Sequence, residues 1–146
     1  MSKVLVVYTT RTGKTKEIAN AVAEGLRFAG AEVKVVDAKN IKNESELEGY
    51  DAYVFGSPTY HGEMMQPMKT MLFMAEKANL EGKVGGAIGS YGWSGEAPDR
   101  IYNTMKNIFK MNMVSNFLKV KSTSTTGETQ QAAQTYGREI GQKIKA

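Results

Sequence analysis

The sequence contains no cysteine and only one histidine, His61. Without a thiol, the chain cannot form a disulfide, a thiolate zinc site, an iron–sulfur cluster or a cysteine nucleophile. A single imidazole also leaves little material for a histidine metal centre or a Ser/His/Asp triad. The sequence therefore predicts no metal site, and it leaves little material for thiol or triad catalysis.

Long apolar runs are missing as well. The first apolar stretch, residues 4–8, is far too short for a membrane span or the core of a signal peptide. The cytoplasm is therefore the expected compartment. The chain has 146 residues, 41% hydrophobic and 23% charged, which suits one ordinary globular domain. We expect that domain to span residues 1–146.

The charge is unevenly distributed along the chain. The formal net charge is +4, but residues 1–99 carry a net −2 and residues 100–146 carry a net +6. A basic C-terminal third can attract an acidic partner or a polyanion. The alternative is a solvated helical face with spare lysines. A nucleic-acid-binding protein is not indicated, because no basic and aromatic recognition motif accompanies these charges.

Apolar runs and helical patterns alternate along the chain. The runs predict buried strands at residues 3–8, 33–36, 52–56, 84–90 and 117–121. Apolar residues three and four apart predict helices at residues 15–29, 66–76, 97–110 and 128–144. This alternation predicts an α/β fold, with a doubly wound five-stranded parallel sheet of order 2-1-3-4-5 and helices on both faces.

In such a sheet a ligand binds beyond the carboxyl ends of the strands, where the strand order reverses. Three loops should meet there, at residues 9–15, 57–66 and 89–98. The first loop brings threonine hydroxyls and backbone N–H groups to a helix N-terminus, which is an anion site. It is not a Walker A loop, because Tyr8 stands where that motif needs glycine. The Gly-x-Gly-x-x-Gly dinucleotide fingerprint is also absent.

Three motifs in these loops carry a family resemblance that covers essentially the whole chain. Thr10-x-Thr12-Gly13-x-Thr15 resembles the phosphate loop of flavodoxins, and Gly56-Ser57-Pro58-Thr59-Tyr60 resembles their second flavin loop. The segment 89–96 (GSYGWSGE) resembles their third loop, above all in the flavodoxin domain of flavodiiron proteins, although no di-iron domain is present. The expected fifth strand carries no insertion, as in the short-chain group of flavodoxins.

The resemblance implies a flavodoxin-like fold that holds one flavin mononucleotide (FMN) non-covalently. A flavin ring has apolar faces and a polar edge, so it needs aromatic side chains and backbone hydrogen bonds. Tyr60 should cover one face, and either Trp93 or Tyr91 the other. The residues expected to bind FMN are Thr9, Thr10, Arg11, Thr12, Gly13, Lys14, Thr15, Ser57, Pro58, Thr59, Tyr60, His61, Gly62, Gly89, Ser90, Tyr91, Gly92, Trp93 and Gly95.

Two departures from the family pattern stand out. In many flavodoxins a glycine follows the stacking aromatic residue, and its peptide flips on reduction. Here His61 takes that position and Gly62 comes next. The flip is then either more costly or moved to Gly62, because histidine adopts positive φ less freely than glycine. The sequence pI near 9.2 also contrasts with the acidic character of typical flavodoxins.

The resemblance implies an electron carrier rather than an enzyme. Such a protein shuttles low-potential electrons between redox partner proteins, and the basic charge predicts partners with acidic docking faces. We expect a monomer that contacts neither membrane nor nucleic acid. Two alternatives stay open: a flavodoxin-like NAD(P)H:quinone oxidoreductase that transfers two electrons, and a non-redox binding module.

Overall fold

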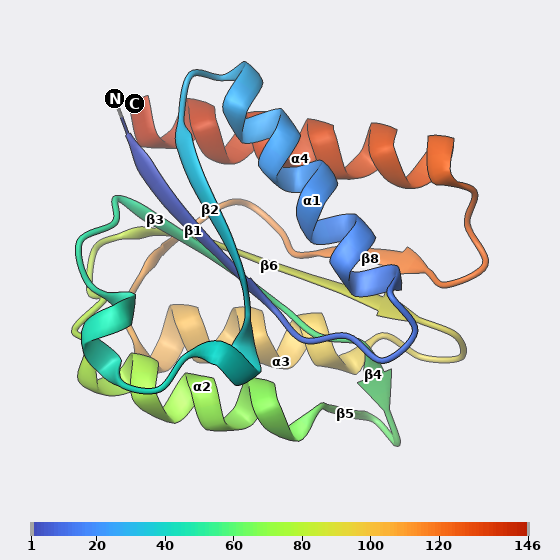
Figure 1. Cartoon of the computed structure of the whole chain (residues 1–146), viewed down its shortest axis with the longest axis horizontal. Helices are drawn as coiled ribbons and strands as arrows, with labels where there is room; N and C mark the ends of the chain where they lie inside the picture. Colours follow the sequence, from blue (N-terminus) through green and yellow to red (C-terminus); the bar gives the residue numbers. More distant parts are fainter. Residues whose placement is uncertain (1, 146) are drawn as a thin grey trace.

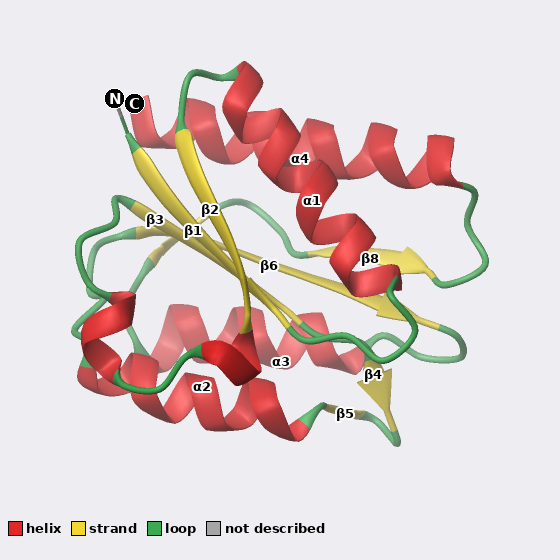
Figure 2. Cartoon of the chain, viewed as in Figure 1, coloured by secondary structure: helices red, strands yellow, loops and turns green. Residues whose placement is uncertain are grey.

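The computed structural model describes residues 2–145, in which strands and helices alternate (Figure 2). The first half contains β1 (Lys3–Tyr8), α1 (Lys14–Phe28), β2 (Glu32–Asp37), β3 (Ala52–Gly56), β4 (Thr59–Tyr60), β5 (Glu63–Met64) and α2 (Gln66–Lys77). The second half contains β6 (Val84–Tyr91), α3 (Glu96–Asn103), β7 (Asn112–Met113), β8 (Leu118–Lys121) and α4 (Thr126–Lys145). Two short 3₁₀ helices, Ala38–Asn40 and Glu44–Leu47, lie between β2 and β3.

The main sheet is parallel and runs β2-β1-β3-β6, with both β7 and β8 beside the far edge of β6. In β1, Val6 lies opposite Val35 on one side and Val54 on the other. β7 pairs with the start of β6, and β8 pairs with its end. The predicted order is therefore confirmed, with the fifth position divided between two short strands. The sequence had predicted one strand there, at residues 117–121.

Helices cover both faces of the sheet (Figure 1), because side chains of a strand alternate between its two faces. Val4 and Val6 of β1 belong to the core under α1 and α4, whereas Leu5 and Val7 belong to the core over α2 and α3. The apolar stripe predicted for α1 is buried throughout, at Ile18, Ala19, Val22, Ala23 and Leu26.

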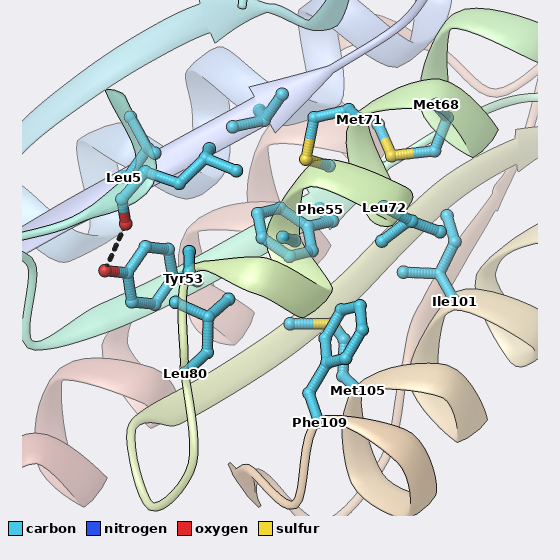
Figure 3. Packing of buried hydrophobic residues seen from close by; sticks show 14 of the residues in the cluster. Leu5, Tyr53, Phe55, Met68, Met71, Leu72, Leu80, Ile101, Met105 and Phe109 are labelled. Carbon is cyan, nitrogen blue, oxygen red and sulfur yellow. Dashed lines mark hydrogen bonds between the residues drawn. The ribbon is translucent and has the colours of Figure 1, made fainter. Parts of the chain in front are cut away.

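The core over α2 and α3 is shown in Figure 3. Phe55 of β3 is fully buried, and so are Met68 and Met71 of α2. Tyr53 brings a hydroxyl into this apolar layer and donates it to the Leu47 carbonyl, at 2.5 Å. Burial raises the pKa of the Tyr53 hydroxyl, so this donor stays protonated at neutral pH. The contact closes the second 3₁₀ helix onto the sheet.

The prediction of one α-helix from residue 97 to residue 110 is wrong in its second half. α3 ends at Asn103, and a π-helical turn follows at Thr104–Ile108. The Phe109 N–H accordingly donates to the Thr104 carbonyl, at 3.1 Å. This wider turn keeps Met105 and Phe109 buried, but it leaves Ile108 58% exposed. Nowhere in residues 2–145 is a helix long and apolar enough to span a bilayer.

Candidate functional site

The three predicted loops meet at the carboxyl ends of β1, β3 and β6, where they enclose an open cavity of about 590 Å³. Such a volume suits a small-molecule or cofactor site. Figure 1 shows this edge of the sheet beside β4 and the start of α1. The residues that line the cavity are Thr12, Pro58, Thr59, Tyr60, His61, Gly62, Ser90, Tyr91, Gly92, Trp93, Ser94 and Ser122.

The first loop leaves the N-terminus of α1 free for an anion. Gly13 is the residue before the helix and has a φ of +96°, which L side chains rarely adopt. Its own N–H donates to the Thr10 hydroxyl, at 2.9 Å. No side chain caps the helix that follows. Because the first N–H groups of a helix have no partner within it, they are available to a phosphate at this point.

Some hydroxyls and charges of the first loop are engaged within the protein. Thr15 is buried, and its Oγ1 lies 2.8 Å from the Ser90 Oγ at the end of β6. The Lys14 ammonium donates to the Ser124 carbonyl at 2.8 Å and lies 3.3 Å from the Glu17 carboxylate. Thr9 is buried, and its N–H donates to the Gly56 carbonyl. Thr9, Lys14 and Thr15 lie outside the cavity lining.

Arg11 approaches the cavity from the first loop. Its guanidinium carbon lies 4.9 Å from the centre of the Tyr60 ring, within the range of a cation–π contact. Tyr60 is half-buried and lines the cavity. Arg11 therefore contacts the aromatic wall of the cavity from the first loop.

The second loop forms a small antiparallel hairpin that the sequence did not predict. β4 and β5 pair with Tyr60 opposite Glu63, and His61 and Gly62 form the turn. The φ angles of these two residues are +52° and +72°. Positive φ at both central residues defines the type I′ turn, which fits the twist of two-residue hairpins. The histidine thus takes a left-handed conformation that favours glycine.

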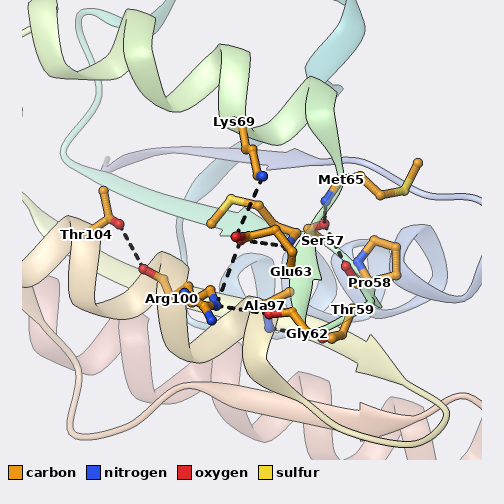
Figure 4. A network of polar contacts seen from close by, with 11 residues as sticks. Ser57, Pro58, Thr59, Gly62, Glu63, Met65, Lys69, Ala97, Arg100 and Thr104 are labelled. Carbon is orange, nitrogen blue, oxygen red and sulfur yellow. Dashed lines mark hydrogen bonds and ion pairs between the residues drawn. The ribbon is translucent and has the colours of Figure 1, made fainter.

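Polar contacts attach the base of this hairpin to the rest of the protein (Figure 4). The fully buried Ser57 accepts a hydrogen bond from the Met65 N–H, at 3.0 Å, so its hydroxyl joins the two ends of the loop. The Thr59 hydroxyl accepts from the Ala97 N–H, also at 3.0 Å. It thereby caps the first turn of α3, where the preceding residue, Gly95, offers no side chain.

The two aromatic side chains of the third loop, Tyr91 and Trp93, differ in how far they are buried. Tyr91 is half-buried, with the Lys119 ammonium 5.3 Å from its ring centre. Trp93 also lines the cavity, but 97% of it is exposed. A side chain on Gly95 would collide with Lys119. Gly92 is exposed, and a Cβ there would meet only the Ser122 hydroxyl, at 3.6 Å, so a ligand can approach its backbone.

Gly89 has a packing role in this structure. It lies within β6, where a Cβ would meet the Ser57 carbonyl oxygen at 2.5 Å and the Pro98 ring at 2.8 Å. Its lack of a side chain allows the second loop and α3 to approach the sheet. The cavity lining does not include it.

Ser94 and Ser122 line the cavity but were not among the residues predicted from the sequence. Ser122 follows β8, and its N–H donates to the Tyr91 carbonyl at 2.7 Å. The position of Ser122 could have been predicted from the sequence, because it follows the last predicted strand, and the carboxyl ends of parallel strands lie at the same edge of the sheet. Hydrogen bonds from the Ser94 hydroxyl and from the Glu96 backbone N–H lower the pKa of the Glu96 carboxyl below its ordinary value, and the bond from Ser94 has the larger effect.

A cavity lined by aromatic side chains and by Thr12, which lies just before the uncapped start of α1 in the sequence, suits a phosphorylated aromatic cofactor. Comparisons with known proteins agree. A family model described as Flavodoxin matches residues 6–136. A solved flavodoxin from the domain Archaea is 32% identical and superposes with a TM-score of 0.92, covering 99% of both chains. The chain belongs to the flavodoxin family.

Some relatives are larger proteins. The rubredoxin oxygen:oxidoreductase from Desulfovibrio gigas is 27% identical, with a TM-score of 0.90 over 99% of this chain and 36% of that chain. Diflavin flavoprotein A 2 from Thermosynechococcus vestitus is 31% identical over 147 residues, which is 99% of this chain and 25% of that protein. The chain thus spans about a quarter of the length of that relative.

FMN is the cofactor of this family, which confirms the cofactor predicted from the sequence. The residues present fit FMN on two observations of this structure. α1 begins at Lys14, directly after Gly13, without a side-chain cap, which suits the phosphate. The cavity wall carries Tyr60, Tyr91 and Trp93, which suit a flat ring.

Proposed function

We propose that the protein is an electron carrier that holds FMN in the cavity described above. The observation that carries this proposal is the open cavity beside an uncapped helix N-terminus, with the aromatic side chains of Tyr60, Tyr91 and Trp93 on its wall. When bound, FMN supplies the redox chemistry, because its ring accepts and releases electrons.

In this proposal the protein binds and orients its cofactor. The N–H groups at the start of α1 and the Thr12 side chain hold the phosphate. Tyr60 covers one face of the ring. Trp93 would cover the other face, because its side chain is 97% exposed and so can turn toward a ring, whereas Tyr91 is half-buried. The backbone of Gly92 approaches the polar edge of the ring.

Redox partners with acidic docking faces suit the charge near this edge of the protein. Lys119 and Lys121 are exposed on β8, and Arg11 is exposed in the first loop. Attraction between opposite charges raises association rates and weakens as salt rises. The proposal therefore predicts faster electron transfer to acidic partners at low ionic strength. The monomeric state and the cytoplasmic location stay predictions from the sequence.

An NAD(P)H:quinone oxidoreductase is the second candidate. A protein from Archaeoglobus fulgidus named NAD(P)H dehydrogenase (quinone) is 31% identical over 122 residues, which cover 67% of this chain and 64% of that protein. Such an enzyme transfers electrons in pairs and needs access for two substrates. The two functions therefore differ in the number of electrons moved at each step.

An anaerobic reductive titration of the FMN-loaded protein separates these candidates. An electron carrier takes up electrons in two resolved one-electron steps, visible as successive changes in the absorption spectrum. A single two-electron transition, together with quinone reduction by NADH or NADPH, would assign the second candidate. A protein that binds FMN no more tightly than riboflavin, which lacks the phosphate, would contradict the proposed site.

A further inference from the structure

The turn of the β4–β5 hairpin forms one wall of the cavity and is itself held from outside the cavity. Tyr60, His61 and Gly62 all line the cavity. The Arg100 Nε on α3 donates to the Gly62 carbonyl at 3.0 Å. This contact joins residues 38 positions apart in the sequence. Figure 4 shows the arginine reaching the turn from the helix below it.

Glu63, the residue after the turn, adds ion pairs to the contact between Arg100 and the turn. One carboxylate oxygen of Glu63 lies 3.9 Å from the Arg100 Nε, and the other lies 3.6 Å from the Lys69 ammonium on α2. Exposed ion pairs of this kind contribute little by themselves. The hydrogen bond from the charged arginine to a carbonyl is stronger and directional. Arg100 thus fastens the tip of the hairpin, whereas Thr59 and Ser57 fasten its base.

His61 limits the conformations that the turn can take. A residue with a Cβ has one comfortable region at positive φ, the left-handed helical one. Rotating the following peptide by half a turn would move His61 into a region that only glycine visits readily. With the Gly62 carbonyl bound to Arg100, the peptide planes on both sides of Gly62 are restricted.

We propose that Arg100 is a positioning residue for the FMN site. By binding the Gly62 carbonyl it holds that group toward α3 and sets which backbone atoms of the turn face the cavity. The wall of the site is then ordered before any ligand arrives, so less conformational entropy is lost on binding. This inference rests on the proposed function for its ligand, but the fixed turn is a property of the protein alone.

The test uses the full chain with Arg100→Gln and Arg100→Lys. The first variant removes the charge and the guanidinium, and the second keeps the charge but loses the planar donor. Lys106→Gln is the matched control, because it removes one charge from the exposed side of the neighbouring π-helical turn. The first readout is the ¹⁵N order parameter of the Gly62 and Glu63 amides in the protein without cofactor.

We expect order parameters near 0.85 in the wild type and in Lys106→Gln, and values below about 0.6 in both Arg100 variants. The FMN dissociation constant should rise about tenfold in both Arg100 variants and stay unchanged in the control. Rigid amides in both Arg100 variants would overturn the proposal. Equal mobility in Lys106→Gln would also overturn it, because the loss of a nearby charge would then explain the effect.

Failure of the proposed function looks different. In that case the wild type would bind FMN poorly, while the order parameters would still separate the Arg100 variants from the control. If Arg100→Gln does not fold, Arg100→Lys decides the outcome, since it keeps the charge and the aliphatic stem.

Discussion

The hydroxyls of Thr15 and Ser90 lie 2.8 Å apart and share a hydrogen bond in the interior of the protein. Thr15 is 1% exposed and Ser90 is 4% exposed, so both hydroxyls are largely shielded from water. The pair joins the first turn of α1 to the end of β6. It therefore sets how far the anion-binding end of the helix stands from the third loop.

Replacing Thr15 by valine should destabilise the protein by about 1–3 kcal/mol, because the Ser90 hydroxyl would be left buried without a partner. Urea unfolding measures this free energy. The double variant Thr15→Val/Ser90→Ala should lose less than the sum of the two single variants, since it removes both partners. Additive losses would show that the two hydroxyls do not interact.

α1 and α4 pack with their backbones in contact at glycines. A Cβ on Gly137 would overlap the Val22 carbonyl oxygen, whereas a Cβ on Gly127, in the same helix, has nothing within 4 Å. Gly137→Ala should therefore lose about 1–3 kcal/mol of stability, because the helices must separate. Gly127→Ala is the matched control and should be neutral or slightly stabilising. Thermal unfolding of both variants checks this difference, and equal effects would refute close packing at Gly137.

Trp93 is the one tryptophan of the chain, so its fluorescence reports its surroundings. If it covers the flavin, adding FMN should quench that emission strongly. Trp93→Ala should weaken FMN binding by roughly tenfold, through the loss of aromatic contact area. Tyr91→Ala serves as the comparison, because Tyr91 lines the same cavity. A larger loss of FMN affinity in Tyr91→Ala would assign the second ring face to that residue.

The start of α4 should make stability depend on pH. The Thr125 backbone N–H and hydroxyl both donate to the Glu128 carboxylate, and these hydrogen bonds, the backbone one first, hold the pKa of the Glu128 carboxyl below its ordinary value. A carboxyl whose pKa is lower in the folded state stabilises the protein above the unfolded pKa, and this contribution disappears as the pH falls through the folded pKa.

We therefore expect the free energy of unfolding to decline below about pH 4.5, and to decline less steeply in Glu128→Gln. Urea titrations across that range measure the slope. Thr125→Ala should also make the decline of the unfolding free energy with falling pH less steep, since it removes one of the two donors to the carboxylate. An unchanged slope in Glu128→Gln would contradict this assignment.

Much of the fold follows from hydrophobic periodicity, because the strands of this sheet are buried on both faces. The β-branched run of β1 and the apolar stripe of α1 are unambiguous signals, and both elements form within one residue of their predicted limits. The π-helical turn was not predictable in this way. A wider turn depends on the packing of Met105 and Phe109 in the core, which a helical pattern does not encode.

The candidate site was predictable as a set of loops but not in its detailed contacts. The topology of the sheet brings the three loops together, independently of their side chains. Which threonines face inward depends on tertiary partners: Thr15 is turned to Ser90, whereas Thr12 lines the cavity. The His61–Gly62 turn was hard to predict, because histidine favours the left-handed conformation less than asparagine or glycine does.

The division of the fifth strand position bears on how this fold can vary. β7 is held by Val84 and Gly85, and β8 by residues 88–91, so each piece has its own anchorage on β6. Ser115 and Asn116, between the two pieces, are exposed. Extra residues there would lengthen a surface connection at a small entropic cost, while β8 would keep Ser122 at the cavity. The short chain thus already contains a permissive point for insertion, at the strand whose uninterrupted sequence first suggested the short-chain group.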